Sequence, residues 1–331
     1  MQVKDIGERG LLRILQKFCP AEIVGDDCAV MATTPNQSLA ITTDMLVEGV
    51  HFSDRTTGPY YAGWRAAAAN LSDLAAMGAK PLAVTVALAV AADTALEWVE
   101  EFYRGMTACL QEYHTPIVGG DVVRSPVVTV AITAFGEVEC DRTIRRSNAR
   151  SNWAIVATGF HGASRAGLEL LLNPEFGQNL AEVDRAFLIL AHQRPKPRLD
   201  VLPVVWEILD SAGEFSIAGM DSSDGLADAI IQICRASGVG AKVDRTKIPI
   251  PNIFSEIVST EKALDWALYG GEDFELVLFL PLTSAQLLVE KIGSRAAIVG
   301  TTTESTDIWL TDSSGIYPDS RLKLDRGFQH F

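Results

Sequence analysis

Residues 39–44 read LAITTD, an apolar run that alternates like a β-strand and then ends on Asp44. Five other stretches share this form, in which an apolar or glycine-rich run ends on acidic residues. They read GDD (25–27), LSD (71–73), GGD (119–121), DSSDG (221–225) and GGED (270–273). Carboxylates are costly to bring near a core unless a partner compensates them. Six such run ends therefore indicate a site that gathers hard cations, most simply Mg²⁺, and with them phosphate.

Strand-like and helix-like patterns alternate along the chain and predict an α/β fold. Apolar residues at helical spacing predict helices over 11–18, 61–77, 96–110 and 226–233. Strands are expected over 39–43, 82–90, 117–118, 127–135, 153–158, 217–220, 274–280 and 296–299. The polar, arginine-rich stretch 141–150 indicates a domain boundary. It predicts an N-terminal α/β domain over 1–140 and a C-terminal α/β domain over 141–331.

Composition and charge limit the class of partner. With 331 residues, 48% of them hydrophobic, the chain is globular and long enough for two domains. A net charge of −14 argues against nucleic acid or an anionic membrane as the main partner, because either calls for a basic surface. The five cysteines show no C-x-x-C spacing, and no apolar signal or membrane-spanning segment is visible. We expect reduced thiols and a cytoplasmic location.

The spacing of the polar residues in the N-terminal segments predicts which of them share one face of a helix or strand. Asn70 and Asp73 lie three residues apart and therefore share one face of the expected helix. Thr42, Thr43 and Asp44 are expected where a strand ends. Adjacent strand residues face opposite ways, but a turn there would bring their oxygens around one ion.

The acidic segments GGD, DSSDG and GGED contain glycine, which lets the backbone approach a ligand closely. The two glycines before Asp121 are expected at the end of a strand, a common site location in α/β sheets. In the DSSDG stretch, Ser223 or Asp224 is expected to cap the following helix, which explains one carboxylate there but not both. Glu272 and Asp273 precede a strand and follow two glycines, so the same backbone argument applies to them.

Several familiar catalytic motifs are missing. The sequence has no G-x-x-x-x-G-K-[ST] phosphate loop, no protein-kinase glycine loop and no G-x-S-x-G elbow. Any ATP would therefore be held mainly through metal bridges and backbone amides, with Arg145 or Arg146 as further clamps. A basic cluster in a linker is more often simply solvated, so the arginines alone do not indicate a site.

Seven segments, in a fixed order along nearly the whole chain, resemble those of the thiamine-monophosphate kinase family. They are GDDCAV (from 25), ITTDMLVEGVHF (41), NLSDLAAMGAKP (70), VGGDVVRSP (118), RRSNA (145), DSSDGL (221) and GGEDFEL (270). The resemblance implies the two-domain α/β (α+β) fold of the aminoimidazole-ribotide synthetase-like (PurM-like) superfamily, with N-terminal sheets that pair across a homodimer. It also implies several Mg²⁺, ATP as co-substrate, and direct in-line phosphorylation of thiamine monophosphate to thiamine diphosphate.

The resemblance also assigns roles by position. It implies metal ligation by Asp27, Thr42, Thr43, Asp44, Asp73, Asp121, Asp221 and Asp224. Among these, Asp44, Asp73 and Asp121 are expected to be catalytic. It implies nucleotide contacts at Tyr103, Gly120, Asp121, Arg146 and Ser223. It implies that His51, Glu272 and Phe328 hold the thiamine phosphate.

This chain departs from the family pattern at a few positions. The second-domain loop usually reads T-G-x-x-G-D-x-A-A-G-L, but here Ala163 stands in place of the acidic residue and Arg165 adds a charge. Ser222 replaces an apolar residue, and Asn148 replaces a glycine. The role of the 158–168 loop in binding nucleotide or metal therefore does not carry over.

Two other functions stay open at this level. One is another ATP-using synthetase of the same superfamily. Against it, Cys19 lacks a glycine-rich nucleophile loop, and the chain ends in His330-Phe331 where hydrogenase-maturation relatives end in cysteine. The other is a non-enzymatic, acidic protein that binds divalent cations, which leaves the ordered segments unexplained.

Overall fold

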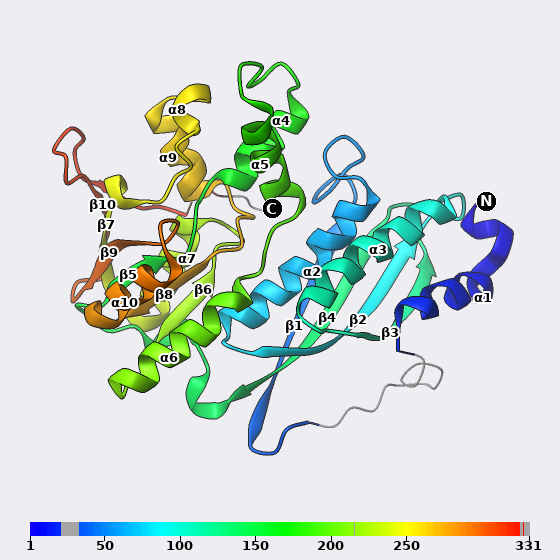
Figure 1. Ribbon diagram of the computed structural model, residues 1–331, viewed down its shortest axis with the longest axis horizontal. Helices are drawn as coiled ribbons and strands as arrows, with labels where there is room; N and C mark the ends of the chain where they lie inside the picture. Colours follow the sequence, from blue (N-terminus) through cyan, green and yellow to red (C-terminus); the bar gives the residue numbers. More distant parts are fainter. Residues whose placement is uncertain (21–32, 215, 325–326, 328–331) are drawn as a thin grey trace. The chain divides into compact units, whose positions relative to one another are not determined.

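The structure is a computed structural model that describes residues 1–20, 33–214, 216–324 and 327 (Figure 1). The chain divides into two compact units. Unit 1 comprises Met1–Leu74 and Ala79–Cys140, and unit 2 comprises Ala75–Gly78 and Asp141–Phe331. Two predicted site residues, Asp27 and Phe328, lie outside the described residues.

Unit 1 is built on a four-stranded sheet with strand order β1-β4-β2-β3. Its strands are β1 (Gln37–Val47), β2 (Lys80–Val90), β3 (Ile117–Arg124) and β4 (Thr129–Glu139). Strand β4 pairs antiparallel with β1 and β2, whereas β2 and β3 run parallel and are joined through a helix. The helical elements of this unit are α1 (Val3–Leu15), η1 (Gln16–Phe18), α2 (Pro59–Ala76) and α3 (Leu96–Glu112). Each helix and strand predicted for this part of the chain is present, although some of their ends differ from the prediction.

Two predicted strand ends in unit 1 are wrong. Strand β1 does not turn at Asp44 but continues to Val47. Likewise, Asp121 lies in the middle of β3, which continues to Arg124. Polar side chains suggested a loop at both places, but the backbone hydrogen bonds to β4 and β2 keep these residues extended.

The two faces of the unit 1 sheet differ in burial. Alternate residues of β4, such as Val130, Ile132 and Ala134, are buried. The residues of β1 that point to the other face of the sheet are exposed. Among them, Leu39, Ile41 and Met45 each keep about half of their surface accessible. One sheet face therefore belongs to the core, and the other presents apolar side chains to solvent in the described chain.

Unit 2 contains a seven-stranded mixed sheet with strand order β11-β10-β7-β9-β5-β8-β6. Its strands are β5 (Ala154–Ala157), β6 (Ala218–Asp221), β7 (Gly240–Asp244), β8 (Leu276–Leu280), β9 (Ala297–Thr303), β10 (Ile308–Thr311) and β11 (Ser320–Arg321). Its longer helices are α4 (Ala163–Leu172), α5 (Glu182–Gln193), α6 (Leu202–Ala212), α7 (Leu226–Ser237), α9 (Thr260–Tyr269) and α10 (Leu282–Ile292). Its short helical segments are η2 (Cys140–Arg142), η3 (Arg146–Asn148), η4 (Arg198–Val201), η5 (Arg245–Lys247) and α8 (Phe254–Ile257).

The central strands of unit 2 are covered on both faces. In β5, Ile155 and Ala157 join a buried cluster that includes residues of α7. Ala154 and Val156, which have the opposite parity, join a second cluster with residues of α6 and α10. Strands buried on both faces read as continuous apolar runs, which is why 154–157 and 276–280 show no polar alternation. Over the described ranges, no helix is long and apolar enough to cross a membrane.

Candidate functional site

In unit 1, a hydrogen-bonded polar set joins β1 to α2. The Thr42 hydroxyl donates to the Asp73 carboxylate, and the backbone N–H of Asp44 donates to Asn70 Oδ1 over 3.1 Å. Asn70 is fully buried and its side-chain amide also donates to the Ala66 carbonyl over 3.0 Å. The predicted shared face of Asn70 and Asp73 therefore lies against β1 rather than in solvent.

Thr43 points away from this set. It pairs with Thr133 across β1 and β4, and the two hydroxyl oxygens are 2.9 Å apart. Because successive strand residues face opposite sides, Thr43 lies on the exposed sheet face while Thr42 and Asp44 lie on the other. The extended strand thus does not bring the three side chains around one point.

Gly120 and Asp121 lie on the edge strand β3. A Cβ atom on Gly120 would lie 2.0 Å from the Val86 carbonyl oxygen, so only glycine fits there. Asp121 is exposed, and its Oδ1 accepts the Val122 N–H at 2.9 Å. Cross-strand pairing places Asp121 in one row with Ala87, Ala131 and Met45, which is the open face of the sheet. Asp44 and Asp121 therefore occupy opposite faces of this sheet.

In unit 2, the DSSDG loop begins at the end of β6. Asp221 is 3% exposed, and its Oδ1 accepts the Ser223 hydroxyl at 3.0 Å. The predicted cap of α7 by Ser223 or Asp224 is wrong, because the N-cap residue is Gly225 with φ 106° and no side-chain cap bond. Ser223 instead donates its hydroxyl to Asp221, within the loop.

The GGED loop packs directly against the DSSDG loop. The Glu272 N–H donates to the Ser223 carbonyl over 2.6 Å. Ser222 and Glu275 exchange two bonds: the Ser222 N–H donates to the Glu275 carbonyl, and the Glu275 N–H donates to the Ser222 hydroxyl, over 2.8 and 3.2 Å. The chain thus joins two predicted motifs that are about 50 residues apart in sequence.

Three further predicted residues have distinct surroundings. Arg146, in η3, is exposed and donates from Nη1 to Gln232 Oε1 of α7 over 2.6 Å. His51 accepts the Val47 N–H on Nδ1 at 3.1 Å, just beyond β1. Tyr103 is 3% exposed, its ring centroid lies 5.4 Å from that of Phe18, and burial raises the pKa of its hydroxyl.

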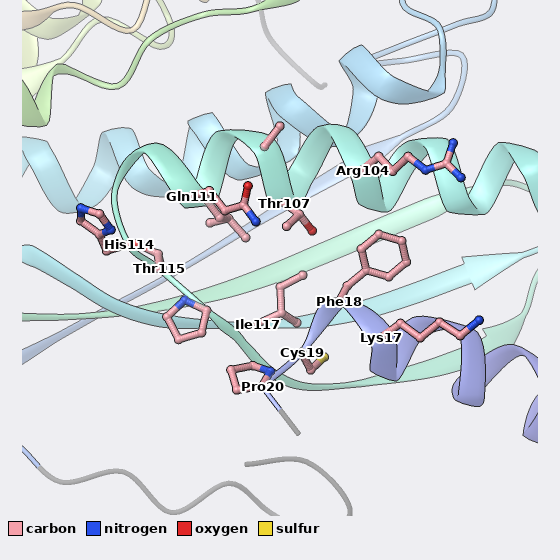
Figure 2. A pocket seen from close by; sticks show the side chains of 13 residues that line it. Lys17, Phe18, Cys19, Pro20, Arg104, Thr107, Gln111, His114, Thr115 and Ile117 are labelled. Atoms are coloured by element: carbon pink, nitrogen blue, oxygen red, sulfur yellow. The ribbon is translucent and has the colours of Figure 1, made fainter. Parts of the chain in front are cut away.

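Beside Phe18 lies a cavity of about 710 Å³ between η1 and α3 (Figure 2). Lys17, Arg104 and His114 supply basic groups to its lining, and Phe18 and Ile117 supply apolar surface. Thr107, one helical turn after Tyr103, also lines it, and its buried Oγ1 has no hydrogen-bond partner among the described residues. Sequence reasoning missed this cavity, although the i, i+4 spacing of Tyr103 and Thr107 on α3 was a usable signal.

The carboxylates form no large cluster by themselves. Among the described residues, no group of three or more His, Cys, Asp or Glu side chains is placed to hold a metal ion. Unit 1 does offer a compact set of hard oxygen donors in Thr42 and Asp73, beside Asp44. Protein-bound Mg²⁺ commonly uses one or two carboxylates together with substrate phosphates and water. This donor set therefore fits Mg²⁺ by its chemistry.

Comparison with known proteins covers both units. The family model for "AIR synthase related protein, N-terminal domain" matches residues 25–138. A curated thiamine-monophosphate kinase of Synechococcus elongatus is 49% identical over 331 residues, which span 99% of this chain and 98% of that protein. The thiamine-monophosphate kinase of Aquifex aeolicus is 30% identical over 335 residues and matches over 100% of both chains.

Solved structures agree with these sequence matches. The thiamine-monophosphate kinase from Stenotrophomonas maltophilia superposes with a TM-score of 0.76 at 31% identity, over 86% of this chain and 88% of that one. The structure of AaThiL complexed with AMPPCP and TMP superposes with a TM-score of 0.72 at 29% identity. The match covers 97% of this chain and 98% of that one. These matches confirm the predicted α/β fold of the aminoimidazole-ribotide synthetase-like superfamily. With 49% identity over essentially its full length to a curated member, the chain belongs to the thiamine-monophosphate kinase family.

Proposed function

We propose that this protein transfers the γ-phosphoryl group of ATP to thiamine monophosphate and so forms thiamine diphosphate. The observation that carries this proposal is the hydrogen-bonded set of Thr42, Asp73, Asp44 and Asn70, in a chain that aligns end to end with thiamine-monophosphate kinases. AaThiL, a relative at 29% identity, was solved with AMPPCP and TMP together, which supports a nucleotide and a second ligand for this fold.

Mg²⁺ would be held in unit 1 by Asp44, Asp73 and Thr42. Family position also assigns metal ions to Asp27, Thr43, Asp121, Asp221 and Asp224. Thr43 and Asp121 face the other side of the unit 1 sheet, so they would not share an ion with Asp44 of the same copy. When bound, Mg²⁺ supplies positive charge that neutralises phosphate oxygens and orients them for in-line transfer. The protein's part is to hold oxygen donors in place: the Asn70 amide fixes the strand at Asp44, and Thr42 fixes the Asp73 carboxylate.

The acceptor is itself a phosphate, so the chemistry needs no general base. The second pKa of a phosphate monoester is about 6, and at neutral pH most of it is already a nucleophilic dianion. The main obstacle is charge repulsion, which at roughly 4 Å and an effective dielectric near 20 costs about 4 kcal/mol per pair of unit charges. Direct transfer between two bound phosphates, without a phosphoenzyme, follows from these two properties.

We assign the thiamine phosphate to His51, Glu272 and Phe328. Glu272 stands on the loop that packs against the DSSDG motif, as its bond to Ser223 shows. Gly327, the residue before Phe328, lies near the DSSDG motif. A Cβ atom built on Gly327 would lie 3.8 Å from the Asp224 carbonyl oxygen. Gly327 and the GGED loop thus both lie against the DSSDG motif, which supports a role of this region in substrate binding.

We assign the nucleotide to Tyr103, Gly120, Asp121, Arg146 and Ser223, and its adenosine part to the cavity beside Phe18. Ile117 lines this cavity, and Gly120 follows three residues later on the same strand, about 10 Å away. The Phe18 ring on the cavity wall suits stacking on a base.

We further propose a homodimer that pairs the open faces of the unit 1 sheets. Leu39, Ile41 and Met45 on β1 and Val123 on β3 are 49% to 59% exposed, and together they make an apolar face on a sheet. Asp121 lies on this same face, so pairing would bring it towards the second copy. A cytoplasmic location remains a prediction.

One assay decides between the proposed activity and its alternatives. Purified protein is incubated with Mg²⁺, ATP and thiamine monophosphate, and thiamine diphosphate is followed by chromatography with ADP measured in parallel. We expect equal amounts of the two products. ATP consumption without thiamine diphosphate would favour another synthetase of the superfamily. Cation binding with no ATP turnover would favour the non-enzymatic alternative.

A further inference from the structure

The GGED loop has an unusual backbone. Gly271, Glu272 and Phe274 have φ values of 66°, 58° and 52°, all in the left-handed region. Two of these three residues carry side chains for which this conformation is costly, and such conformations persist only when surrounding contacts hold them. The conformation of Glu272, the residue assigned to the substrate, therefore depends on what holds this loop.

Asp273 anchors the loop to the first turn of α4. Its Oδ2 accepts the Gly162 N–H at 2.7 Å, and its Oδ1 accepts the Ser164 N–H at 2.9 Å. The first N–H groups of a helix have no partner within the helix and carry partial positive charge, so a carboxylate is well placed there. Burial raises the pKa of Asp273 to about 7, although the two backbone bonds act in the opposite direction.

The same turn of α4 also reaches the Glu272 side chain. The Ser164 hydroxyl lies 3.2 Å from His192 Nδ1 on α5, and that nitrogen lies 3.8 Å from Glu272 Oε2. His192 is buried, with only 2% of its surface exposed. Ser164 thus contacts Asp273 through its backbone and His192 through its side chain, so α4 constrains both ends of the Glu272–Asp273 pair.

We propose that Asp273 is a positioning residue for thiamine monophosphate: by tying the GGED loop to the N-terminus of α4, it holds Glu272 in its left-handed conformation beside His192. Asp273 itself touches no substrate. This inference rests on the proposed role of Glu272 in binding thiamine monophosphate. It gives Asp273 a function through Glu272 that a purely structural carboxylate would not have.

The test compares Asp273→Asn with Asp244→Asn. Asp244 is a matched control in unit 2, because it is 8% exposed and also accepts backbone N–H groups, from Thr246 at 3.0 Å and Ser313 at 3.4 Å. We expect Asp273→Asn to raise the KM for thiamine monophosphate about tenfold, with the KM for ATP within twofold of wild type. Asp244→Asn lowers the melting temperature but leaves both KM values unchanged.

A double-mutant cycle with Glu272→Gln tests whether Asp273 acts through Glu272. If it does, adding Asp273→Asn to Glu272→Gln causes less than a twofold further rise in the KM for thiamine monophosphate. Independent, multiplicative effects would overturn the proposal. Calorimetric titration of thiamine monophosphate gives the same comparison as a binding constant, without turnover.

The outcomes separate this inference from the proposed function. If wild-type protein makes no thiamine diphosphate, the proposed function fails. If wild-type protein is active and Asp273→Asn binds thiamine monophosphate normally, only the positioning role fails. Should Asp273→Asn not fold, Asp273→Glu keeps a carboxyl group but displaces it by one methylene. A folded Asp273→Glu with an unchanged KM for thiamine monophosphate would also overturn the proposal.

Discussion

The β1–α2 set of unit 1 and the paired loops of unit 2 hold their polar groups in different ways. In unit 1, Asp44 and Asp73 stand on a strand and a helix that have ordinary backbone conformation. Single hydrogen bonds join these two elements, from the Thr42 hydroxyl to Asp73 and from the Asp44 N–H to Asn70. In unit 2, Asp221 and Glu272 stand at loops that need left-handed residues and are held by backbone bonds between motifs. Unit 1 residues should therefore be replaceable without loss of fold, whereas the unit 2 loops combine site and structure.

The largest expected effect comes from Asp44→Asn. The substitution keeps the shape of the side chain and does not touch the Asp44 N–H bond to Asn70, so the fold should persist. Loss of a metal-ligating charge should lower kcat at least about 1,000-fold. Activity and the melting temperature are measured together, with exposed Asp54→Asn as the control that keeps both. A stable Asp44→Asn enzyme with near-normal kcat would contradict the proposed metal role.

The pH dependence of stability should expose the buried groups of unit 2. His161 is fully buried, and burial lowers its pKa from 6.5 to about 4. A depressed pKa contributes stability that is present above pH 6.5 and lost as pH falls through 4. At about 1.4 kcal/mol per pKa unit, this amounts to about 3 kcal/mol.

His161→Phe removes this titration. Urea unfolding between pH 7 and pH 4 should show the wild-type free energy of unfolding falling relative to the variant. Asp273 acts with the opposite sign, because its raised pKa gives stability that is lost as pH rises towards 7. The pH dependence of the wild-type free energy of unfolding therefore combines both groups. The difference in this free energy between His161→Phe and wild type isolates His161. A constant difference over this range would contradict the assignment to His161.

Gly271→Ala tests the contact between the two loops. A Cβ atom there would lie 2.7 Å from the Ser223 carbonyl oxygen at a φ of 66°. Gly213 at the end of α6 has nearly the same φ, 67°, but nothing within 4 Å of a Cβ atom. We expect Gly213→Ala to cost about 1 kcal/mol and Gly271→Ala roughly twice as much. Only Gly271→Ala should also raise the KM for thiamine monophosphate. Equal losses of stability and equal KM values in the two variants would contradict a specific role of the contact between the loops.

The smallest effect concerns the unit 1 cavity. Thr107→Val is nearly isosteric and removes a buried hydroxyl that has no partner in the described chain, so the free energy of unfolding should change by less than about 0.5 kcal/mol. If the cavity takes the adenosine of ATP, the KM for ATP should rise about threefold while that for thiamine monophosphate stays constant. Steady-state kinetics with each substrate varied provide the measurement. An unchanged KM for ATP would count against the cavity as the nucleotide site.

The sequence predicted side-chain positions correctly where the helical repeat alone decides them. The three-residue spacing of Asn70 and Asp73 was enough to place both on one helix face, and the structure turns that face towards β1. It failed where long-range pairing decides. Strand β1 continues past Asp44 because β4 pairs with it, and Ser223 does not cap α7 because Asp221 accepts its hydroxyl.

The sequence by itself determined the alternating α/β organisation, the family and the residue types available for chemistry, because periodicity and ordered motifs are local properties. Only the tertiary structure showed that Thr43 and Asp121 face away from Asp44, since strand register depends on residues about 35 to 90 positions apart. Only it joined Asp273 to α4 and Glu272 to Ser223, over separations of roughly 50 to 110 residues. Such contacts form because unpaired backbone groups and buried carboxylates must find partners, wherever in the chain those partners lie.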